Sequence, residues 1–392
     1  MSVLTMKTVP EGARVYLVPS LPVWGDVSAF KVGMTGLGYL GFRMIIRHPD
    51  QPTVRLFDDL VLQDHLLGLD LPVALDQQIQ AQLTQMHQCP TQLTYGGQTA
   101  AYSKPLIMGV LNVTPDSFSD GGAYTIVDAA LNHARAMVAA GADILDIGGE
   151  STRPGAKPVW EGDEADRVVP VIKAIKSSPD LSHIPLSIDT RHSFVMTEAI
   201  KAGADIINDV SALTYDGDSL AVAQASNAPI ILMHSKGESK DEHAYDDVLL
   251  DVYDYLAARV AVCEAAGIDR QRLILDPGIG FGKRVLEDNL ILMNNLSLFH
   301  TLGCPILLGA SRKRFIGAIT GVEQAQDRVS GSVTAALKGV MQGIQIVRVH
   351  DVGETKQAIL MQQAFQDHSL MDQPGLRAER LGYADQWNGL DD

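Results

Sequence analysis

The feature that most constrains the fold of this chain is a short pattern that occurs twice. Residues 140–147 read Ala-Gly-Ala-Asp-Ile-Leu-Asp-Ile, and residues 202–209 read Ala-Gly-Ala-Asp-Ile-Ile-Asn-Asp. In each copy a glycine stands where a helix would end in a left-handed residue, and a run of large aliphatic residues begins at once. The expected helix before the first copy places four apolar side chains on one face, namely Val127, Leu131, Ala134 and Val138. The pattern predicts helices that alternate with buried strands.

Eight apolar runs carry this strand signature. They are Leu106–Leu111, Asp143–Ile147, Leu186–Ile188, Asp205–Asn208, Ile230–Met233, Leu273–Leu275, Ile306–Leu308 and Ile346–Val349. Continuous apolar strands separated by helices are typical of parallel sheets that are covered on both faces. Eight such units predict an α/β fold, a closed (β/α)8 TIM barrel over residues 105–370. An open doubly wound sheet is the alternative, although no G-x-G-x-x-G motif follows the first strand.

Residues 1–100 follow a different pattern. Three short β-like runs come first, at Ala13–Val18, Arg43–Arg47 and Thr53–Phe57. One good helix follows them, at about Val73–Met86. This favours a small α+β or mainly β module before the barrel. The module holds no recognisable catalytic constellation, so we treat it as an N-terminal extension of unknown role. Residues 371–392 are polar, and we expect a frayed tail there.

The composition limits the partners of the chain. Its 31 basic and 47 acidic residues give a formal net charge of −16, which disfavours nucleic acid and anionic membrane surfaces. The three cysteines, Cys89, Cys263 and Cys304, are scattered, which suits a reducing compartment and argues against a disulfide or zinc scaffold. The sequence shows no secretion-signal pattern and no apolar run of about 18 residues. We therefore expect a soluble, cytoplasmic protein that binds small molecules, with no nucleic acid and no membrane among its partners.

Polar residues follow every predicted strand, on the face of a barrel that holds the active site. They are Asn112, Asp146 with Glu150, Asp189, Asn208, His234, Asp276, Ser311 with Lys313, and Arg348 with His350. Among them, Asp189, Asn208 and Asp276 supply hydrogen-bond acceptors, which suit a planar heterocycle that carries an amino group beside a ring nitrogen. The alternative for Asp276 is a capping role in the glycine-rich turn that it begins.

Basic residues gather after the last two strands. Barrels often bind phosphate there, so Lys313, Arg348 and His350 predict a phosphorylated or diphosphorylated ligand. At least one residue of the run Arg312–Arg314 is expected to be an ordinary solvated side chain. A diphosphate would suit Mg2+, for which Asn112 is the candidate protein ligand. No Ser or Cys sits in a nucleophile elbow, which argues against covalent catalysis.

The first strand runs directly into the loop Thr114–Gly122, which combines hydroxyl groups, two carboxylates and two glycines. Pro115 and the Gly121-Gly122 pair prevent regular structure from continuing, so these polar groups are expected on a mobile turn over a rigid scaffold. An ordinary strand-to-helix turn is the plainer alternative.

Seven ordered motifs run through the barrel region. They are Gly109–Gly122 (GVLNVTPDSFSDGG), Asp146–Ala156 (DIGGESTRPGA), Ser187–Thr190 (SIDT), Ile207–Val210 (INDV), Leu275–Lys283 (LDPGIGFGK), Ser311–Lys313 (SRK) and Val347–Asp351 (VRVHD). Together they resemble the dihydropteroate synthase family, from about Pro105 to Ala364. The resemblance implies a (β/α)8 barrel that commonly forms a homodimer through its outer helices. It also implies the condensation of 6-hydroxymethyl-7,8-dihydropterin diphosphate with 4-aminobenzoate, which releases diphosphate on the way to folate.

The resemblance assigns roles to individual residues. By likeness, Asp189, Asn208 and Asp276 grip the pterin, and Lys313 lies on its other polar edge. Asn112 binds Mg2+ on the diphosphate, while Arg348 and His350 hold the diphosphate oxygens. The residues that resemble the 4-aminobenzoate pocket are Phe118, Thr152, Arg153, Pro154 and Ser311.

The implied mechanism is dissociative, because a diphosphate on a methylene conjugated to an electron-rich pterin leaves first and the arylamine attacks the resulting cation. The expected catalytic residues are Asp116, Lys313, Arg348 and His350. Arg348 and His350 neutralise the leaving group together with Mg2+, and Asp116 stabilises the cation once its loop closes. The likeness also marks the chain as a sulfonamide target.

One segment departs from the family pattern, and two other functions stay open. After the fifth strand the family often has Met-His-Met, then Gln or Arg and Gly, whereas this chain has Met-His-Ser-Lys-Gly over residues 233–237. Contacts from Ser235 or Lys236 are therefore left unassigned. A pterin-binding methyltransferase of related fold is one rival, but it has no use for a diphosphate site at Arg348 and His350. A non-catalytic paralogue is the other, and the complete loops argue against it.

Overall fold

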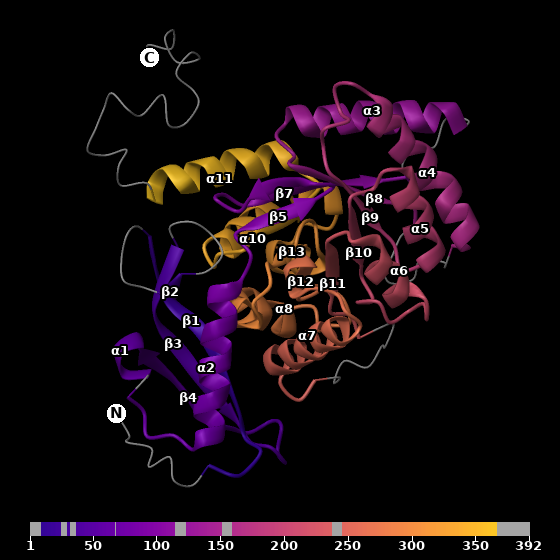
Figure 1. Cartoon of the computed structure of the whole chain (residues 1–392). Coiled ribbons are helices and arrows are strands. Elements are labelled where there is room, and N and C mark those ends of the chain that lie inside the picture. The colour runs from indigo at the N-terminus through magenta and orange to yellow at the C-terminus, as the bar shows by residue number, and fades with distance from the viewer. Residues whose placement is uncertain are drawn as a thin grey trace, which may run out of the picture.

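The computed structural model describes residues 9–24, 30–31, 37–66, 68–113, 123–150, 159–236 and 245–366. Most of the chain forms an eight-stranded parallel barrel, and the N-terminal region forms a smaller antiparallel sheet at its side (Figure 1). The barrel strands lie in the order β12-β11-β10-β9-β8-β7-β14-β13, and a parallel bridge between Leu275 and Ile306 joins the two ends of this row. The predicted (β/α)8 TIM barrel is confirmed, and the alternative prediction of an open doubly wound sheet is wrong.

All eight predicted strands are present, with small shifts at their ends. They are β7 (Leu106–Asn112), β8 (Ile144–Gly148), β9 (Leu186–Asp189), β10 (Ile206–Asp209), β11 (Ile230–Met233), β12 (Leu273–Asp276), β13 (Leu307–Leu308) and β14 (Ile346–Val349). Several strands extend by one residue into the polar position that follows the apolar run. Asp189 and Asp276 are therefore strand residues, held by the backbone ladder of the barrel.

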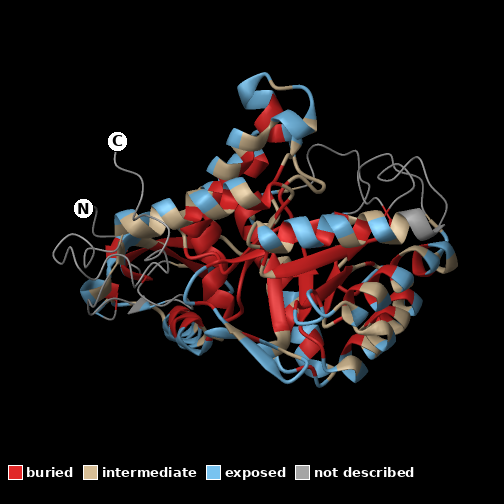
Figure 2. Ribbon diagram, turned by 90° about the horizontal axis from the view of Figure 1, so that it is seen from above, coloured by how far each residue is buried: buried red, intermediate tan, exposed pale blue. Residues whose placement is uncertain are grey.

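Helices surround the barrel and bury one face each. They are α3 (Ala123–Ala139), α4 (Glu161–Ser177), α5 (Ser193–Ala202), α6 (Ser219–Ser226), α7 (Val248–Ala265), α8 (Glu287–Asn294), α9 (Arg314–Thr320), α10 (Val329–Val340) and α11 (Val352–Gln366), with short 3-10 turns η3 (Arg270–Arg272), η4 (Leu296–Leu302) and η5 (Ala325–Asp327). The predicted face of α3 packs against the core. Gly141 and Gly203 follow α3 and α5 with φ angles of 101° and 114°, as the repeated pattern predicts. Figure 2 shows buried strands inside helices whose outer faces are exposed.

The N-terminal module is an antiparallel sheet with two helices. Its elements are β1 (Arg14–Trp24), β2 (Phe30–Lys31), β3 (Leu37–Arg47), β4 (Arg55–Leu62), α1 (Gln63–Leu66) and α2 (Val73–Gln88). Its strands are longer than the runs predicted from sequence. β3 pairs with β1 along one side and with β4 and β2 along the other. A separate apolar core forms where Leu75, Ile79 and Leu83 of α2 pack against this sheet.

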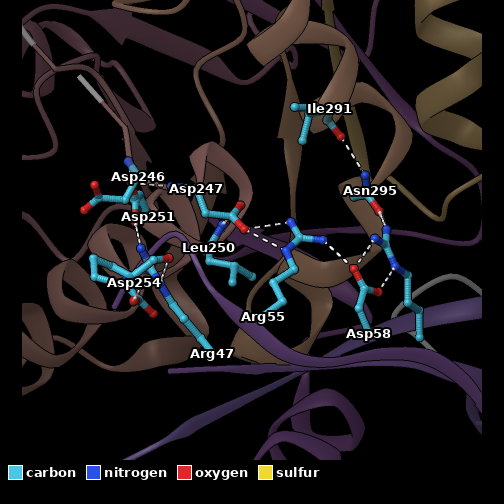
Figure 3. A network of polar contacts seen from close by, with 12 residues as sticks. Arg47, Arg55, Asp58, Asp246, Asp247, Leu250, Asp251, Asp254, Ile291 and Asn295 are labelled. Atoms are coloured by element: carbon cyan, nitrogen blue, oxygen red, sulfur yellow. Dashed lines mark hydrogen bonds and ion pairs between the residues drawn. The ribbon is translucent and has the colours of Figure 1, made fainter. Parts of the chain in front are cut away.

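The module is joined to the barrel by apolar contacts and by ion pairs, and Figure 3 shows the ion pairs. Arg47 on β3 places Nη2 2.6 Å from Asp251 of α7, and Arg55 on β4 places Nη2 2.7 Å from Asp247, the residue that caps the start of α7. Tyr16, on β1, and Ile45, on β3, belong to the same apolar cluster as the barrel core. The module is therefore packed against the outside of the barrel at α7 and η4.

A short hairpin closes the bottom of the barrel. It consists of β5 (Gln92–Tyr95) and β6 (Gln98–Ala101), and its Leu93, together with the nearby Tyr102, packs on the first apolar residues of the barrel strands. The amino ends of the strands are thereby covered with apolar side chains. Any site within the barrel must lie at the opposite, carboxyl end. Among the described helices, none combines the length and the apolar character that crossing a membrane requires.

Candidate active site

Arg348 lies between two carboxylates at the carboxyl end of the barrel. Its Nε atom is 2.6 Å from Asp146 Oδ2 and its Nη2 atom is 2.7 Å from Asp189 Oδ2. Burial alone would lower the pKa of Arg348, but the two neighbouring carboxylates outweigh that effect and raise it. The guanidinium is thus a fixed positive charge. The structure places it against Asp189, which is predicted to hold the pterin, and against Asp146, while its Nη1 atom takes part in neither contact.

Asp189 has one carboxylate oxygen without a partner. Oδ2 accepts the bond from Arg348, whereas Oδ1 is shielded from solvent and has no hydrogen-bond partner within the described ranges. Burial raises the pKa of Asp189, Arg348 offsets part of the shift, and the nearby Asp146 raises the pKa further. A buried acceptor in this state is costly unless a ligand donor reaches it. Such perturbed carboxylates are typical of functional sites.

Asn208 lies beside Asp189 on the neighbouring strand, where the two residues are register partners. Its amide Nδ2 donates to both carboxylate oxygens of Asp146, at 3.2 and 3.3 Å. Asn112 Oδ1 lies at the same end of the barrel, because it and Asp189 Oδ2 both face Gly148. A Cβ atom built on Gly148 would lie 3.7 Å from Asn112 Oδ1 and 3.8 Å from Asp189 Oδ2. The structure therefore brings three predicted site residues together.

Asp276 has the capping role that the sequence offered as one alternative, and its role toward a ligand stays a prediction. Its Oδ1 accepts a 2.7 Å bond from Gly278 N and so caps the glycine-rich turn. Its other oxygen, Oδ2, would lie 3.6 Å from a Cβ added to Gly309, at the end of the next strand. Burial raises the pKa of Asp276, against the lowering effects of the Gly278 bond and of Lys313. One oxygen therefore shapes the turn, and no residue in the described ranges donates a hydrogen bond to the other.

A buried pair that sequence reasoning missed joins the same turn to the residue after β11. Lys283 Nζ lies 3.0 Å from His234 Nδ1 and donates to Phe281 O at 3.0 Å. Burial lowers the pKa of Lys283 to about 7, and burial together with Lys283 lowers the pKa of His234 to about 2. A neutral imidazole thus accepts from the amine. Gly278 permits this arrangement because its φ is +68° and a Cβ there would lie 1.9 Å from His234 O.

The basic residues after β13 divide between two tasks. Lys313 Nζ lies 3.9 Å from the centre of the Phe281 ring, so its charge faces the turn that begins with Asp276. Arg312 instead pairs with Asp351, with Nε 3.1 Å from Oδ2, which makes it structural. Ser311 Oγ is 3.0 Å from His350 Nδ1 and also accepts from His350 N at 3.2 Å. Ser311 and His350 therefore contact each other, and Lys313 lies beside the turn that Asp276 begins.

A second charged group surrounds the base of the loop after β8. Glu150 accepts from Arg191 at 3.1 and 3.2 Å and from Val159 N at 3.1 Å, and His192 Nδ1 lies 2.7 Å from Glu164. Glu150, Glu164 and His192 are close enough together to hold a metal ion. Each makes at least one of these contacts, although Glu164 Oε1 has no hydrogen-bond partner within the described ranges, and Asn112 is not among the three.

Some predicted site residues lie outside the described ranges. They are Asp116, Phe118, Thr152, Arg153 and Pro154, together with the loop Thr114–Gly122 and the tail 371–392. Their roles stay predictions.

Comparison with known proteins agrees with this geometry. The family model described as pterin-binding enzyme matches residues 108–350, which span the barrel from β7 to β14 and contain the acidic cluster. The site is therefore that of a pterin-binding enzyme.

Individual relatives narrow the class. The dihydropteroate synthase of Bacillus subtilis is 45% identical over 279 residues, which are 71% of this chain and 93% of that protein. The Escherichia coli K12 enzyme is 44% identical over 271 residues, 68% of this chain and 94% of its own. The solved dihydropteroate synthase of Xanthomonas albilineans with 4-aminobenzoic acid matches with a TM-score of 0.66 and 45% identity, over 71% of this chain and 98% of that chain. The chain belongs to the dihydropteroate synthase family, a family of transferases, and the methyltransferase alternative is set aside.

Proposed function

We propose that the carboxyl end of the barrel binds 6-hydroxymethyl-7,8-dihydropterin diphosphate and 4-aminobenzoate and joins them into 7,8-dihydropteroate. The observation that carries this proposal is Oδ1 of Asp189, which has no hydrogen-bond partner among the described residues and is held beside Asn208 by the ladder between β9 and β10. A pterin presents an amino group and ring N–H groups along one edge, which are the donors that these acceptors lack. Asp276 Oδ2 extends the same acceptor surface.

Lys313 and Phe281 form the complementary side of the proposed pterin site. The stem of Lys313 is close to Gly280, where a Cβ would lie 3.2 Å from its Cδ, and its ammonium lies over the Phe281 ring. Glycine at position 280 therefore leaves room for the lysine. The ammonium can donate to the carbonyl and ring-nitrogen acceptors of the pterin while Asp189 and Asn208 accept from the opposite edge.

The diphosphate and its metal are assigned to the neighbouring strand ends. Asn112 offers a neutral amide oxygen close to Asp189, and such an oxygen fits Mg2+, which prefers few protein ligands plus phosphate and water. When bound, Mg2+ would neutralise charge on the diphosphate. His350, oriented by Ser311, and the Nη1 side of Arg348 are the candidates to donate to the diphosphate oxygens.

The 4-aminobenzoate site is proposed to combine Ser311 with Phe118, Thr152, Arg153 and Pro154. Ser311 is buried in the segment after β13 and contacts His350, which supports a position for it between the two substrates in this scheme. The Xanthomonas albilineans enzyme has been solved with 4-aminobenzoic acid and, separately, with 7,8-dihydropteroate. The Yersinia pestis enzyme has been solved with a sulfonamide drug, so we propose that sulfonamides compete at this site.

In the proposed reaction the bond between the pterin methylene carbon and the diphosphate oxygen breaks first, and its electron pair leaves with diphosphate. The amino nitrogen of 4-aminobenzoate then forms a bond to the methylene carbon and loses a proton. Arg348 and His350 stabilise the leaving anion, and Asp189, Asp276 and, when its loop covers the site, Asp116 stabilise the cation. The arylamine is neutral, so the reaction needs no strong base.

A direct assay tests this proposal. Purified protein is incubated with the pterin diphosphate, 4-aminobenzoate and Mg2+, and dihydropteroate and released diphosphate are measured by mass spectrometry and a coupled phosphate assay. Equal yields of both products are expected. Binding of both substrates without product would indicate the non-catalytic paralogue. A reaction without 4-aminobenzoate is the control for hydrolysis.

The finer points of assembly and location are also proposals. We propose a homodimer through the outer helices, because Met361 and Phe365 of α11 and Met341 at the end of α10 are exposed although α10 and α11 pack together. Light scattering measures the mass directly.

We propose a cytoplasmic location, which suits three buried cysteines that form no disulfide and can be checked by cell fractionation.

A further inference from the structure

Asp146 forms part of the floor beneath the proposed pterin site. It stands two residues before Gly148 on β8, and Gly148 is the register partner of Asp189, so Asp146 lies one layer deeper in the barrel than Asp189. Its exposed fraction is 0%. Arg348 and Asn208 both contact it. A side chain in this position contacts the residues that bind a ligand and does not contact the ligand itself.

The contact with Asn208 decides which end of that amide faces the pocket. The amide Nδ2 donates to both oxygens of Asp146. The reverse orientation would set the amide oxygen against a carboxylate, where two acceptors repel each other and a donor is lost. With Nδ2 held from below, Oδ1 is the end left for a ligand, and it accepts none of the hydrogen bonds found in the described part of the chain.

The contact with Arg348 acts in the same direction. Asp146 accepts from Nε at 2.6 Å, which leaves Nη2 in position for its 2.7 Å contact with Asp189 Oδ2. That contact involves only Oδ2, and Asp189 Oδ1 has no hydrogen-bond partner in the part of the chain that the structure describes. One buried carboxylate therefore fixes two neighbouring acceptors, Asn208 Oδ1 directly and Asp189 Oδ1 through Arg348.

We propose that Asp146 is a positioning residue that sets the hydrogen-bond polarity of the pterin site, by holding Asn208 with its amide oxygen toward the ligand and by aligning Arg348 against Asp189. This inference rests on the proposed function of the pocket. It assigns no contact between Asp146 and substrate. It predicts that the Asp146 carboxylate can be replaced only when an obligate acceptor is restored at position 208.

Asp146→Asn tests the idea because it conserves shape and removes the charge. The amide of Asn208 is then free to rotate and present its NH2 group to the N–H edge of the ligand, a contact between two donors. Loss of one ligand hydrogen bond from a buried site weakens binding by about 10- to 100-fold. The double variant Asp146→Asn/Asn208→Asp exchanges amide and carboxylate, so the residue at position 208 can only accept and the one at 146 can still donate to it.

The experiment measures the affinity of the full-length protein for two probes by calorimetry. One probe is 6-hydroxymethylpterin, and the other is 6-hydroxymethyllumazine, which carries an oxo group in place of the 2-amino donor. Ser187→Ala is the matched control, because Ser187 is the buried register partner of Asp146 on β9 and its hydroxyl has no hydrogen-bond partner within the described ranges. Thermal unfolding of each variant is recorded alongside.

In Asp146→Asn, affinity for the pterin probe is expected to fall at least about tenfold and affinity for the lumazine probe by less than about threefold. Pterin affinity should return to within about threefold of wild type in the double variant, and Ser187→Ala should change neither probe by more than about twofold. An Asp146→Asn protein that binds pterin within about twofold of wild type, or a double variant no better than the single one, overturns the inference.

The remaining outcomes also decide the question. If Asp146→Asn does not fold, the double variant alone decides: restored pterin binding supports the inference and absent binding overturns it. A wild type that neither binds the pterin probe nor forms dihydropteroate refutes the proposed function and the inference with it. A wild type that forms dihydropteroate while Asp146→Asn keeps normal pterin affinity refutes the inference alone.

Discussion

Replacing Arg47 tests how much the N-terminal module depends on its ion pairs with the barrel. The Arg47 side chain is 9% exposed, and it contacts Asp251 at 2.6 Å and Asp254 at 3.5 Å, both of which are 24% exposed. Its Nε also donates to Pro52 O at 2.8 Å. Arg47→Met keeps the apolar stem and removes all three contacts. Two acidic groups of α7 then face the module without that charge, and one buried oxygen of Asp254 already has no hydrogen-bond partner among the residues that the structure describes.

The expected loss follows from the burial of these groups. Breaking a fully buried ion pair costs about 3–5 kcal/mol, whereas exposed pairs contribute about 0–1 kcal/mol. Because the partners here are partly exposed, we expect the free energy of unfolding to fall by about 2.5 kcal/mol. With a slope of about 3 kcal/mol per molar urea, the unfolding midpoint moves down by about 0.8 M. Intrinsic fluorescence and circular dichroism should both report the change.

The matched control is Arg135→Met. Arg135 pairs with Asp180 at 2.8 Å, but the two side chains are 45% and 55% exposed, so its loss should cost less than about 0.5 kcal/mol. Asp251→Asn combined with Arg47→Met completes a double-mutant cycle, in which a coupling energy of about 1–2 kcal/mol is expected. Equal midpoints for the Arg47 and Arg135 variants would refute the reasoning, because burial would then make no difference.

Three further predictions concern the site. Asp276→Ala should abolish detectable pterin binding, and a calorimetric titration that shows unchanged affinity would contradict the assignment. Because burial lowers the pKa of Lys283 to about 7, the folded state holds fewer protons there than the unfolded chain up to about pH 10. The free energy of unfolding should therefore rise between pH 7 and about pH 9.5 more in wild type than in Lys283→Met, and parallel urea curves would rule this out. Removing divalent ions with EDTA should stop dihydropteroate formation until Mg2+ is restored, and Asn112→Ala should need about tenfold more Mg2+ for half-maximal rate. An unchanged Mg2+ requirement would remove Asn112 as a ligand.

The barrel could be predicted from sequence because its signals are local. Each strand is a short aliphatic run that is covered on both faces, and each polar residue that follows lies at the same end of the sheet. Asp189 and Asp276 were found by this rule, and the structure places both at the carboxyl end.

The N-terminal strands were underestimated because their signals depend on their neighbours. β1 contains Pro19 and Pro22, and β3 contains Gly38 and Gly41, all of which interrupt a strand pattern in sequence. In the sheet, β1 pairs with β3 alone among the described strands, so its prolines lie on an edge strand, where a missing N–H is tolerated. Because β1 pairs with β3 at both Pro19 and Pro22, the strand continues past the two prolines.

The roles of residues inside the site depend on contacts between strands that are distant in the chain. The sequence therefore predicted which polar residues follow the strands, but not which of them contact one another. Arg348 is 202 residues from Asp146 and 159 residues from Asp189, yet it touches both. From sequence, Arg348 was a diphosphate ligand and Asp146 had no role of its own. In the structure, Arg348 contacts only one carboxylate oxygen of Asp189, and the other has no partner among the described residues. Asp146 accepts from the amide nitrogen of Asn208 and so fixes the orientation of that amide. The charge of a residue can be read from the chain, but the direction in which its partners face can be decided only by the closed barrel.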